Sequence, residues 1–218
     1  MNTTGRYAFA GYVADVFQIA SFRFSNPHSL MKFFQIDSLR KRTGAKQFIE
    51  AGTYLGLTAE RCGRVFEKVY TVELDHELVR KASVRLRRHP NIELIEGDAS
   101  LCLEAILGRS DVNDVIIFWD GHACGAYSQS GSVPSIADIS TEPVIAGLSR
   151  ILAYSHKIKG IIVDDFRLFG EQEGFPTKAE LIGFLEGFGG SAFEVTVHLD
   201  QVILARKPST NGAAAKPH

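Results

Sequence analysis

The feature that most constrains this chain is a regular alternation of two kinds of segment between residues 46 and 206. One kind is short, apolar and rich in β-branched or aromatic residues, which is typical of buried strands. The other kind is longer and carries apolar residues at helical spacing. The predicted strands are 46–51, 68–74, 91–97, 114–120 and 159–166, and the predicted helices are 57–66, 76–88, 99–107, 141–155 and 177–188. Strands that alternate with helices predict a parallel sheet covered on both faces.

The C-terminal part of the pattern changes. Segments 192–199 and 201–207 predict two further strands, which a tight turn at Asp200 would join as an antiparallel pair. We therefore expect an α/β fold with a doubly wound, Rossmann-like sheet. It would have five parallel strands followed by this antiparallel pair, and so seven strands in all.

The sheet and its helices would form one domain, residues 46–206, because a chain of 218 residues that is 45% hydrophobic can bury one sizeable core. Residues 1–45 would form a helical extension, with an amphipathic helix within 7–22 and a second helix at 29–41. Polar residues interrupt 7–22, which argues against a signal peptide and leaves membrane-surface contact as the alternative. Residues 207–218 would be a frayed tail.

Charge and cysteine content exclude several classes of protein. Lysine and arginine number 24 and aspartate and glutamate 25, so the net charge is −1 and the basic excess of a nucleic-acid-coating protein is missing. The three cysteines, Cys62, Cys102 and Cys124, form no CxxC pair, which disfavours a disulfide framework or a zinc knuckle. A reducing compartment such as the cytoplasm fits this usage. No run reaches the ~20 apolar residues that a membrane-spanning helix needs.

Acidic residues end every one of the five predicted parallel strands. In an open α/β sheet the ligand binds at the carboxyl ends of the strands, at the topological switch point. Helix N-caps would explain one or two acids there, but five of five favours a shared site. The residues are Glu50, Glu73, Asp98, Asp120 and the pair Asp164–Asp165.

The first of these strand ends lies in IEAGTYLGLTAE, residues 49–60. Gly52 and Gly56 permit a tight turn from strand to helix. A dinucleotide fingerprint would read GxGxxG, whereas this turn reads ExGxxxG, and Glu50 would repel a diphosphate. A ligand with an ammonium and a sulfonium group, such as S-adenosylmethionine, would instead favour a carboxylate. The alternative is a generic strand-to-helix turn.

The next two acids suit the adenosine part of such a ligand. Glu73 can accept both ribose hydroxyls, while Asp75 is the better candidate for the cap of the following helix. Asp98 could accept the adenine amino group or could simply cap the helix predicted at 99–107. Both interpretations of Asp98 stay open at this point.

The remaining acids, Asp120, Asp164 and Asp165, should converge on neighbouring strands beyond the switch point. Three close carboxylates need a proton or a cation to coexist, and oxygen-only ligands suit Mg²⁺. His122 follows Asp120 closely and could serve as a general base, since its ordinary pKa lies near neutrality. The alternatives are that Asp165 caps a turn and that His122 is an ordinary loop residue.

Together these motifs resemble the class I S-adenosylmethionine-dependent methyltransferases. The segments that carry the resemblance are FIEAGTYLG, VYTVELD, IELIEGDA, FWDGH and IIVDDFRLFG, and it covers about residues 30–206. The closer likeness is to the branch related to the macrocin-type sugar O-methyltransferases. The resemblance implies methionine contacts at Glu50 and Gly52, a ribose contact at Glu73 and an adenine contact at Asp98.

The resemblance also implies a full set of site residues. The expected cofactor-binding residues are Glu50, Gly52, Thr53, Tyr54, Gly56, Glu73, Leu74, Asp98, Ala99 and Asp120. The expected metal ligands are Asp120, Asp164 and Asp165, and the expected catalytic residues are Asp120 and His122. Two departures stand out: Tyr54 replaces the usual second glycine of the cofactor turn, and the polar loop 121–140 lacks a regular glycine-rich pattern.

The expected activity is transfer of a methyl group to a hydroxyl of a small molecule, a sugar or natural product, with help from a divalent metal. No (N/D)PPY block follows the fourth strand, which disfavours methylation of nucleic-acid amino groups. The loop 121–140 would close over the acceptor, and the N-terminal helix would suit a homodimer interface or a cover for the acceptor site. The alternatives are a catalytically silent adenosine-binding module and, less favoured, a nicotinamide-dependent oxidoreductase.

Overall fold

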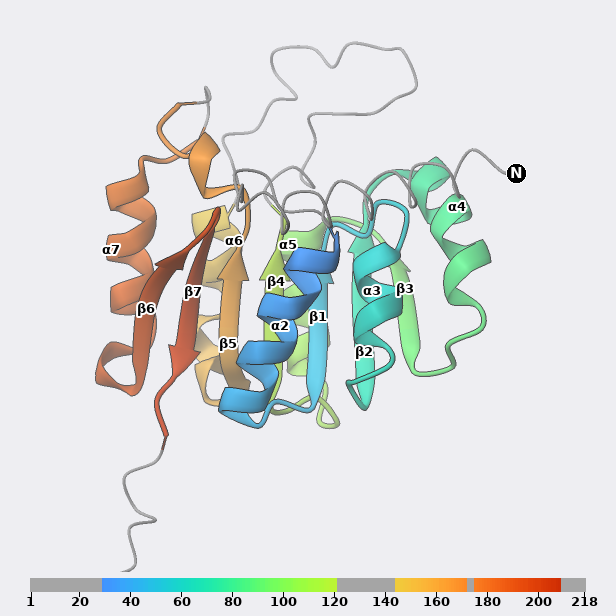
Figure 1. Ribbon diagram of the computed structural model, residues 1–218, viewed down its shortest axis with the longest axis horizontal. Helices are drawn as coiled ribbons and strands as arrows, with labels where there is room; N and C mark the ends of the chain where they lie inside the picture. Colours follow the sequence, from blue (N-terminus) through green and yellow to red (C-terminus); the bar gives the residue numbers. More distant parts are fainter. Residues whose placement is uncertain (1–28, 121–143, 172–174, 209–218) are drawn as a thin grey trace, which may run out of the picture.

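Seven strands form one sheet, and helices cover both of its faces (Figure 1). The computed structural model describes residues 29–120, 144–171 and 175–208. The strands are β1 (Gln47–Ala51), β2 (Lys68–Glu73), β3 (Ile92–Glu96), β4 (Val115–Trp119), β5 (Ile158–Val163), β6 (Phe193–His198) and β7 (Gln201–Arg206).

The strand order is β3-β2-β1-β4-β5-β7-β6. Strands β1 to β5 pair in parallel, whereas β7 is antiparallel to both β5 and β6. This confirms the predicted α/β sheet and its antiparallel C-terminal pair. The order reverses between β1 and β4, so the switch point lies at the carboxyl ends of these two strands.

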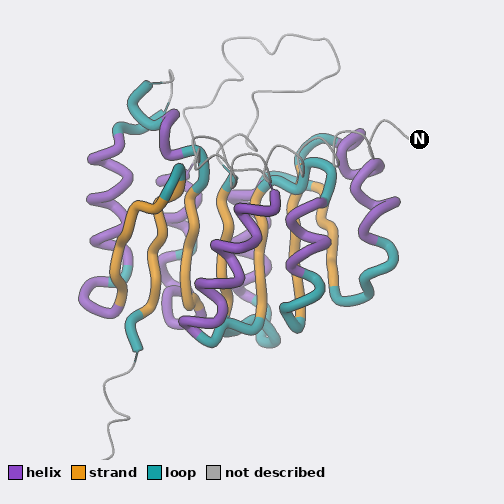
Figure 2. Tube along the Cα trace, viewed as in Figure 1, coloured by secondary structure: helices purple, strands orange, loops and turns teal. Residues whose placement is uncertain are grey.

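Six α-helices are described, three for each face of the sheet (Figure 2). They are α2 (Ser29–Thr43), α3 (Leu57–Cys62), α4 (His76–Leu86), α5 (Ala99–Gly108), α6 (Val144–Arg150) and α7 (Lys178–Phe188). Short 3-10 turns follow α6, β5 and α7; they are η2 (Leu152–Lys157), η3 (Phe166–Leu168) and η4 (Gly190–Ala192). The helix predicted at 141–155 is therefore shorter than expected and continues as η2.

The core divides into two clusters because strand side chains alternate between the faces of the sheet. Phe48 and Phe118 pack with buried residues of α2, α3 and α4. Ile49 and Trp119, one position further along the same strands, pack with buried residues of α5, α6 and α7. A side chain's position in its strand therefore determines which helices it meets.

Polar side chains fix the ends of several elements. Asp75 caps α4 by accepting hydrogen bonds from the backbone N–H groups of Glu77 (2.8 Å) and Leu78 (3.0 Å), as predicted. Thr177 and Glu180 form a capping box at the start of α7. Both caps satisfy backbone N–H groups that the first turn of a helix leaves without partners.

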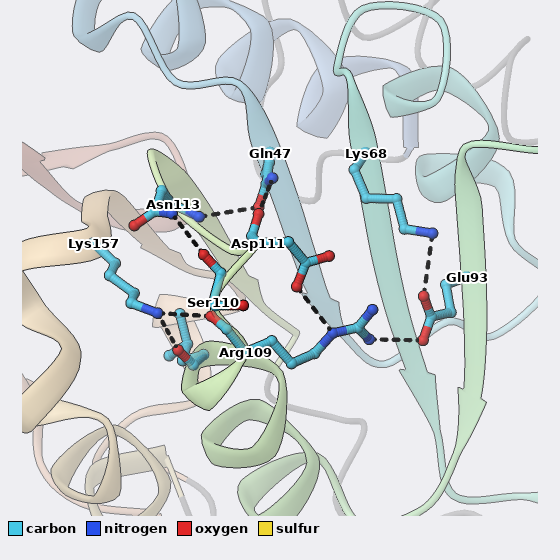
Figure 3. A network of polar contacts seen from close by, with 9 residues as sticks. Gln47, Lys68, Glu93, Arg109, Ser110, Asp111, Asn113 and Lys157 are labelled. Carbon is cyan, nitrogen blue, oxygen red and sulfur yellow. Dashed lines mark hydrogen bonds and ion pairs between the residues drawn. The ribbon is translucent and has the colours of Figure 1, made fainter.

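A network of polar side chains lies at the amino ends of the strands (Figure 3). Lys157 donates to the carbonyl oxygens of Leu107 and Arg109, each at 2.8 Å, and so holds the end of α5. Arg109 in turn pairs with Glu93 at 3.0 Å. This network supports the edge of the sheet opposite to the carboxyl ends of the strands.

Several expectations fall outside the described residues. They are the helix within 7–22, the loop 121–140 with His122, and the tail from residue 209 onward. Within the described ranges, every helix is too short or too polar to pass through a lipid bilayer.

Candidate active site

The acidic strand ends meet at one edge of the sheet. Ladder hydrogen bonds continue one residue past two strands: Asp120 N–H donates to the Ala51 carbonyl at 3.1 Å, and Asp164 N–H donates to the Trp119 carbonyl at 2.9 Å. With the pairing of β2 and β1, this register makes four positions neighbours in one row. They are Glu73, Gly52, Asp120 and Asp164.

Glu50 lies two positions before Gly52 and shares one face of the sheet with Asp120. Glu50 follows Phe48 by two positions in β1, and Asp120 follows Phe118 by two positions in β4. Side chains two positions apart in a strand lie on the same face. Since Phe48 and Phe118 face α2, α3 and α4, the carboxylates lie on that side as well.

Glu50 is 2% exposed and belongs to a chain of hydroxyl groups. The Thr71 hydroxyl donates to Glu50 Oε2 at 2.6 Å. Since the single hydroxyl hydrogen of Thr71 is used in this bond, the Thr53 hydroxyl donates to Thr71, also at 2.6 Å. The chain of bonds connects the turn after β1 with the buried carboxyl group.

The environment of Glu50 favours its neutral form when no cation is bound. Burial raises the pKa of Glu50 to about 8, although the hydrogen bond from Thr71 opposes the shift, and the nearby charge of Asp120 adds to it. A bound ammonium or sulfonium group would lower this pKa, because a nearby positive charge stabilises the ionised carboxylate. Glu50 is therefore a carboxyl group whose charge depends on a cationic ligand.

Glu73 is held by three backbone N–H groups. Its Oε2 accepts from Tyr54 N–H at 2.8 Å, and its Oε1 accepts from Leu74 and Asp75 N–H at 3.0 Å each. The carboxylate is thus fixed by the turn after β1 and by the turn after its own strand. Each carboxylate oxygen offers two lone-pair sites, so one site on Oε2 remains for a single ligand hydroxyl, whereas sequence analysis had expected Glu73 to accept both ribose hydroxyls.

The turn after β1 adopts the left-handed backbone region at three residues: Gly52 (φ 99), Tyr54 (φ 48) and Gly56 (φ 74). At Gly56 an added Cβ would also lie 3.2 Å from the Leu86 side chain. A non-glycine residue in this region costs about 1–2 kcal/mol. Tyr54 therefore carries backbone strain, and its N–H reaches Glu73 from this conformation.

Large apolar side chains remain exposed around this edge. Tyr54 is 53%, Leu74 49% and Leu101 57% exposed. They follow β1, follow β2 and begin α5, respectively, and so come from the elements that hold Glu73 and Asp98. Exposed apolar surface beside fixed polar groups is typical of a ligand site. Sequence analysis had named Tyr54 and Leu74, but not Leu101.

Asp98 is the N-cap of α5. Its Oδ1 accepts from Ser100 N–H at 2.7 Å and from Leu101 N–H at 3.4 Å. The capping interpretation is therefore correct. Only Oδ2 would remain to accept a hydrogen bond from an adenine amino group. Of the other expected cofactor residues, Thr53 and Ala99 are buried, at 4% and 6% exposed, and support the turn and the start of α5.

Asp120, Asp164 and Asp165 come together as expected. One oxygen from each lies within 4.8 Å of the other two. Asp164 is fully buried, and Gln201 donates to its Oδ1 at 2.8 Å. Asp165 does not cap η3 through its side chain; it pairs with Arg167 at 2.7 Å.

Lys32 is the residue that sequence analysis missed. It lies in the first turn of α2, and its Nζ is 3.1 Å from Asp120 Oδ2 and also forms an ion pair with Asp164 Oδ2. Burial disfavours its ammonium form, but Asp120 and the other carboxylates outweigh burial and hold the pKa of Lys32 above its ordinary value. The available signal was its spacing: Lys32 precedes the buried Ile36 and Leu39 by four and seven residues, so it lies on the apolar face of the helix.

The carboxylate cluster fits a divalent ion by its chemistry. Three converging carboxylates suit a hard cation such as Mg²⁺. Two cationic side chains, Lys32 and Arg167, already pair with these carboxylates. An ion in the middle of the cluster would therefore have to replace Lys32.

Comparisons with known proteins agree on the fold. No protein-family model and no curated protein sequence matches the chain. Among solved structures, TomG, an O-methyltransferase of Streptomyces achromogenes in complex with S-adenosylmethionine, is 16% identical, with TM-score 0.54 over 80% of this chain and 78% of TomG. PaMTH1, a methyltransferase of Podospora anserina with bound S-adenosylhomocysteine, is 17% identical, with TM-score 0.53 over 80% of this chain and 77% of PaMTH1.

A third similar structure belongs to a protein described as an rRNA methylase, whose acceptor is a nucleic acid. It is an rRNA methylase of Streptococcus thermophilus, 13% identical, with TM-score 0.51 over 79% of this chain and 94% of the methylase. The chain therefore has the seven-stranded fold found in S-adenosylmethionine-dependent methyltransferases. The fold is common to enzymes with unrelated acceptors, so the acceptor must be argued from the site.

Proposed function

We propose that this protein is an S-adenosylmethionine-dependent methyltransferase that acts on a hydroxyl of a small molecule, a sugar or natural product, as the macrocin-type O-methyltransferases do. The observation that carries the proposal is the row of carboxylates at the switch point. Glu50 and Glu73 flank the turn where a dinucleotide-binding protein would hold a diphosphate. Two carboxylates there oppose a phosphate ligand and favour a cationic one.

Different residues would bind different parts of S-adenosylmethionine. Glu50 would pair with the ammonium group of the ligand, and Glu73 would accept one ribose hydroxyl at the free site of Oε2. Leu74 and Leu101 offer apolar surface for the adenine ring. S-adenosylmethionine would supply a methyl group on a sulfonium, which is already a good leaving group, so the remaining task of the protein is alignment of the acceptor.

The residues on the acceptor side begin at Asp120, which lies next to Gly52 in the row. Its side chain is 26% exposed, so a substrate hydroxyl can reach it and give up a proton to it. His122 remains a second candidate for this role. Asp120, Asp164 and Asp165 would hold a divalent ion, which would stabilise negative charge on the acceptor oxygen.

Thermal shift and methyl release together test the proposal. S-adenosylhomocysteine and S-adenosylmethionine should raise the melting temperature, and NAD should not, because a ligand at 100 times its Kd stabilises a protein by about 2.7 kcal/mol. Release of labelled methyl groups should then follow with a panel of hydroxylated acceptors. Stabilisation by NAD alone would support an oxidoreductase, whereas cofactor binding with no methyl release across the panel would support the silent binding module.

A further inference from the structure

We propose that Lys32 is the resident cation of the cluster formed by Asp120, Asp164 and Asp165, and that it competes directly with any divalent ion for these carboxylates. The ammonium group and the ion would be alternative occupants of one position. Metal ions would then bind only when Lys32 withdraws. The consequence for catalysis rests on the proposed function, whereas the inference itself concerns ion binding.

The geometry leaves room for one cation. The three ligand oxygens lie within 4.8 Å of one another, and Lys32 Nζ already contacts Asp120 Oδ2 and Asp164 Oδ2. A divalent ion bound by all three carboxylates would lie among these residues, next to the Lys32 ammonium. An ammonium group and a divalent ion that share two ligands would also repel each other strongly at such short range.

Both oxygens of the buried Asp164 carboxylate already have a partner. Gln201 donates to Oδ1 at 2.8 Å, and Oδ2 pairs with the Lys32 ammonium. A metal ion that binds Asp164 must therefore take over the place of Lys32 at Oδ2, because burial leaves this oxygen no access to solvent.

The position of Lys32 is built into the fold. Ile36 and Leu39, on the same face of α2, are 0% and 2% exposed and pack on the sheet below the cluster. The Lys32 side chain is 16% exposed, and its Nζ also lies 5.8 Å from the centre of the Phe118 ring. A largely buried lysine between two acids requires this anchoring, because an unpaired ammonium in the same place would be destabilising.

Charge counting supports the same conclusion. Arg167 is shared between Asp165 and Asp200, so four carboxylates face two cationic side chains and the local charge is 2 − 4 = −2. If a divalent ion replaces Lys32, the local charge becomes 1 + 2 − 4 = −1. The exchange of Lys32 for Mg²⁺ or Mn²⁺ therefore reduces the excess of negative charge.

The test is direct measurement of Mn²⁺ binding, without cofactor or acceptor, in the full-length protein. Lys32→Met keeps the apolar stem and removes the charge, and it should bind Mn²⁺ at least about ten-fold more tightly than the natural protein. Adding Asp164→Asn to Lys32→Met should abolish this gain. Lys41→Met is the matched control, because Lys41 lies on the same helix but pairs only with Asp37 in the described structure, so the Mn²⁺ affinity should not change.

The Mn²⁺ measurements distinguish failure of this inference from failure of the proposed function. Equal Mn²⁺ affinity in the natural protein and in Lys32→Met, or no binding in either, overturns the inference. If Lys32→Met does not fold in metal-free buffer, Mn²⁺ should restore its folding and its melting transition, and Lys32→Gln should behave in the same way. Failure of both variants to respond to Mn²⁺ also overturns it. A protein that shows the ion exchange but binds no S-adenosylhomocysteine would contradict the proposed function alone.

Discussion

The Thr71 hydroxyl donates a 2.6 Å hydrogen bond to Oε2 of Glu50, across the pairing of β2 with β1. The two residues are register partners in neighbouring parallel strands, so their side chains lie on the same face of the sheet. Through the further hydrogen bond between Thr53 and Thr71, the buried carboxyl group is connected to the turn that would receive the cofactor. The charge of Glu50 is therefore the property of this site most open to measurement.

Affinity for S-adenosylhomocysteine should increase with pH. Because burial raises the pKa of Glu50 to about 8, most molecules carry a neutral carboxyl group at pH 6 and must lose a proton to pair with the ligand ammonium. We expect the Kd to fall about ten-fold per pH unit between pH 6 and 7.5 and to level off above 8. Calorimetry in two buffers with different ionisation enthalpies would measure the proton release.

Glu50→Gln provides the control for this prediction. The amide can still accept the Thr71 hydrogen bond but cannot ionise, so the variant should bind weakly and with little dependence on pH. A pH slope as steep as that of the natural protein would assign the titration to another group.

The stability of the ligand-free protein should show the opposite trend with pH. The folded state binds the Glu50 proton up to about pH 8, whereas an unfolded chain releases it near the ordinary value of 4.5. The folded state then holds more protons, so its Glu50 contribution is fully present below about pH 4.5 and is lost as pH rises towards 8. Urea unfolding at a series of pH values should give a slope that Glu50→Gln removes, and an unchanged slope in the variant would contradict the assignment.

Much of this site could be predicted from local sequence. Each strand ends in an acid, and parallel strands place such residues at one edge, so Glu50, Glu73, Asp120 and Asp164 were found without coordinates. The role of Lys32 was not found, because it depends on how α2 packs across β4 and β5. The raised pKa of Glu50 was equally hidden, since it follows from the burial of the side chain in the folded protein.

Glu73→Gln should weaken both the fold and the cofactor site. Three partly buried backbone N–H groups converge on this carboxylate, and a glutamine offers only one accepting oxygen, so at least one of these donors loses its partner. We expect a loss of about 1–3 kcal/mol in the free energy of unfolding and weaker binding of S-adenosylhomocysteine. Chemical denaturation and calorimetry measure the two effects separately, and a variant of natural stability would show that the three donors find other acceptors.

Gly147→Ala should destabilise the protein although alanine favours helices. An added Cβ would overlap Cη2 of Trp119 and lie 3.0 Å from Cζ3 of the same ring, which is fully buried beneath α6. Overpacking of this kind typically costs about 1–3 kcal/mol. Gly183→Ala in α7 is the matched control, because nothing lies within 4 Å of its added Cβ, and it should stabilise by about 0.5–1 kcal/mol. Equal effects of the two substitutions would contradict the packing argument.

Lys157→Met should destabilise the protein and leave the affinity for S-adenosylhomocysteine unchanged. Lys157 donates to the Leu107 and Arg109 carbonyls at the end of α5, far from the carboxyl edge of the sheet (Figure 3). Loss of hydrogen bonds from a charged donor to the end of a helix should cost about 1–2 kcal/mol in the free energy of unfolding. Chemical denaturation would measure this loss and calorimetry the affinity.

The matched control for Lys157→Met is Lys159→Met, two residues away. Lys159 forms a partly exposed ion pair with Asp114 at 3.1 Å, and such pairs contribute little because solvent screens them. Its loss should change stability by less than about 0.5 kcal/mol. If Lys159→Met lowers the free energy of unfolding as much as Lys157→Met does, the loss of positive charge, and not the loss of the hydrogen bonds at the end of α5, explains the effect. If Lys157→Met also weakens cofactor binding, α5 transmits changes from its last turn to Asp98 at its first, and the two edges of the sheet are coupled through this helix.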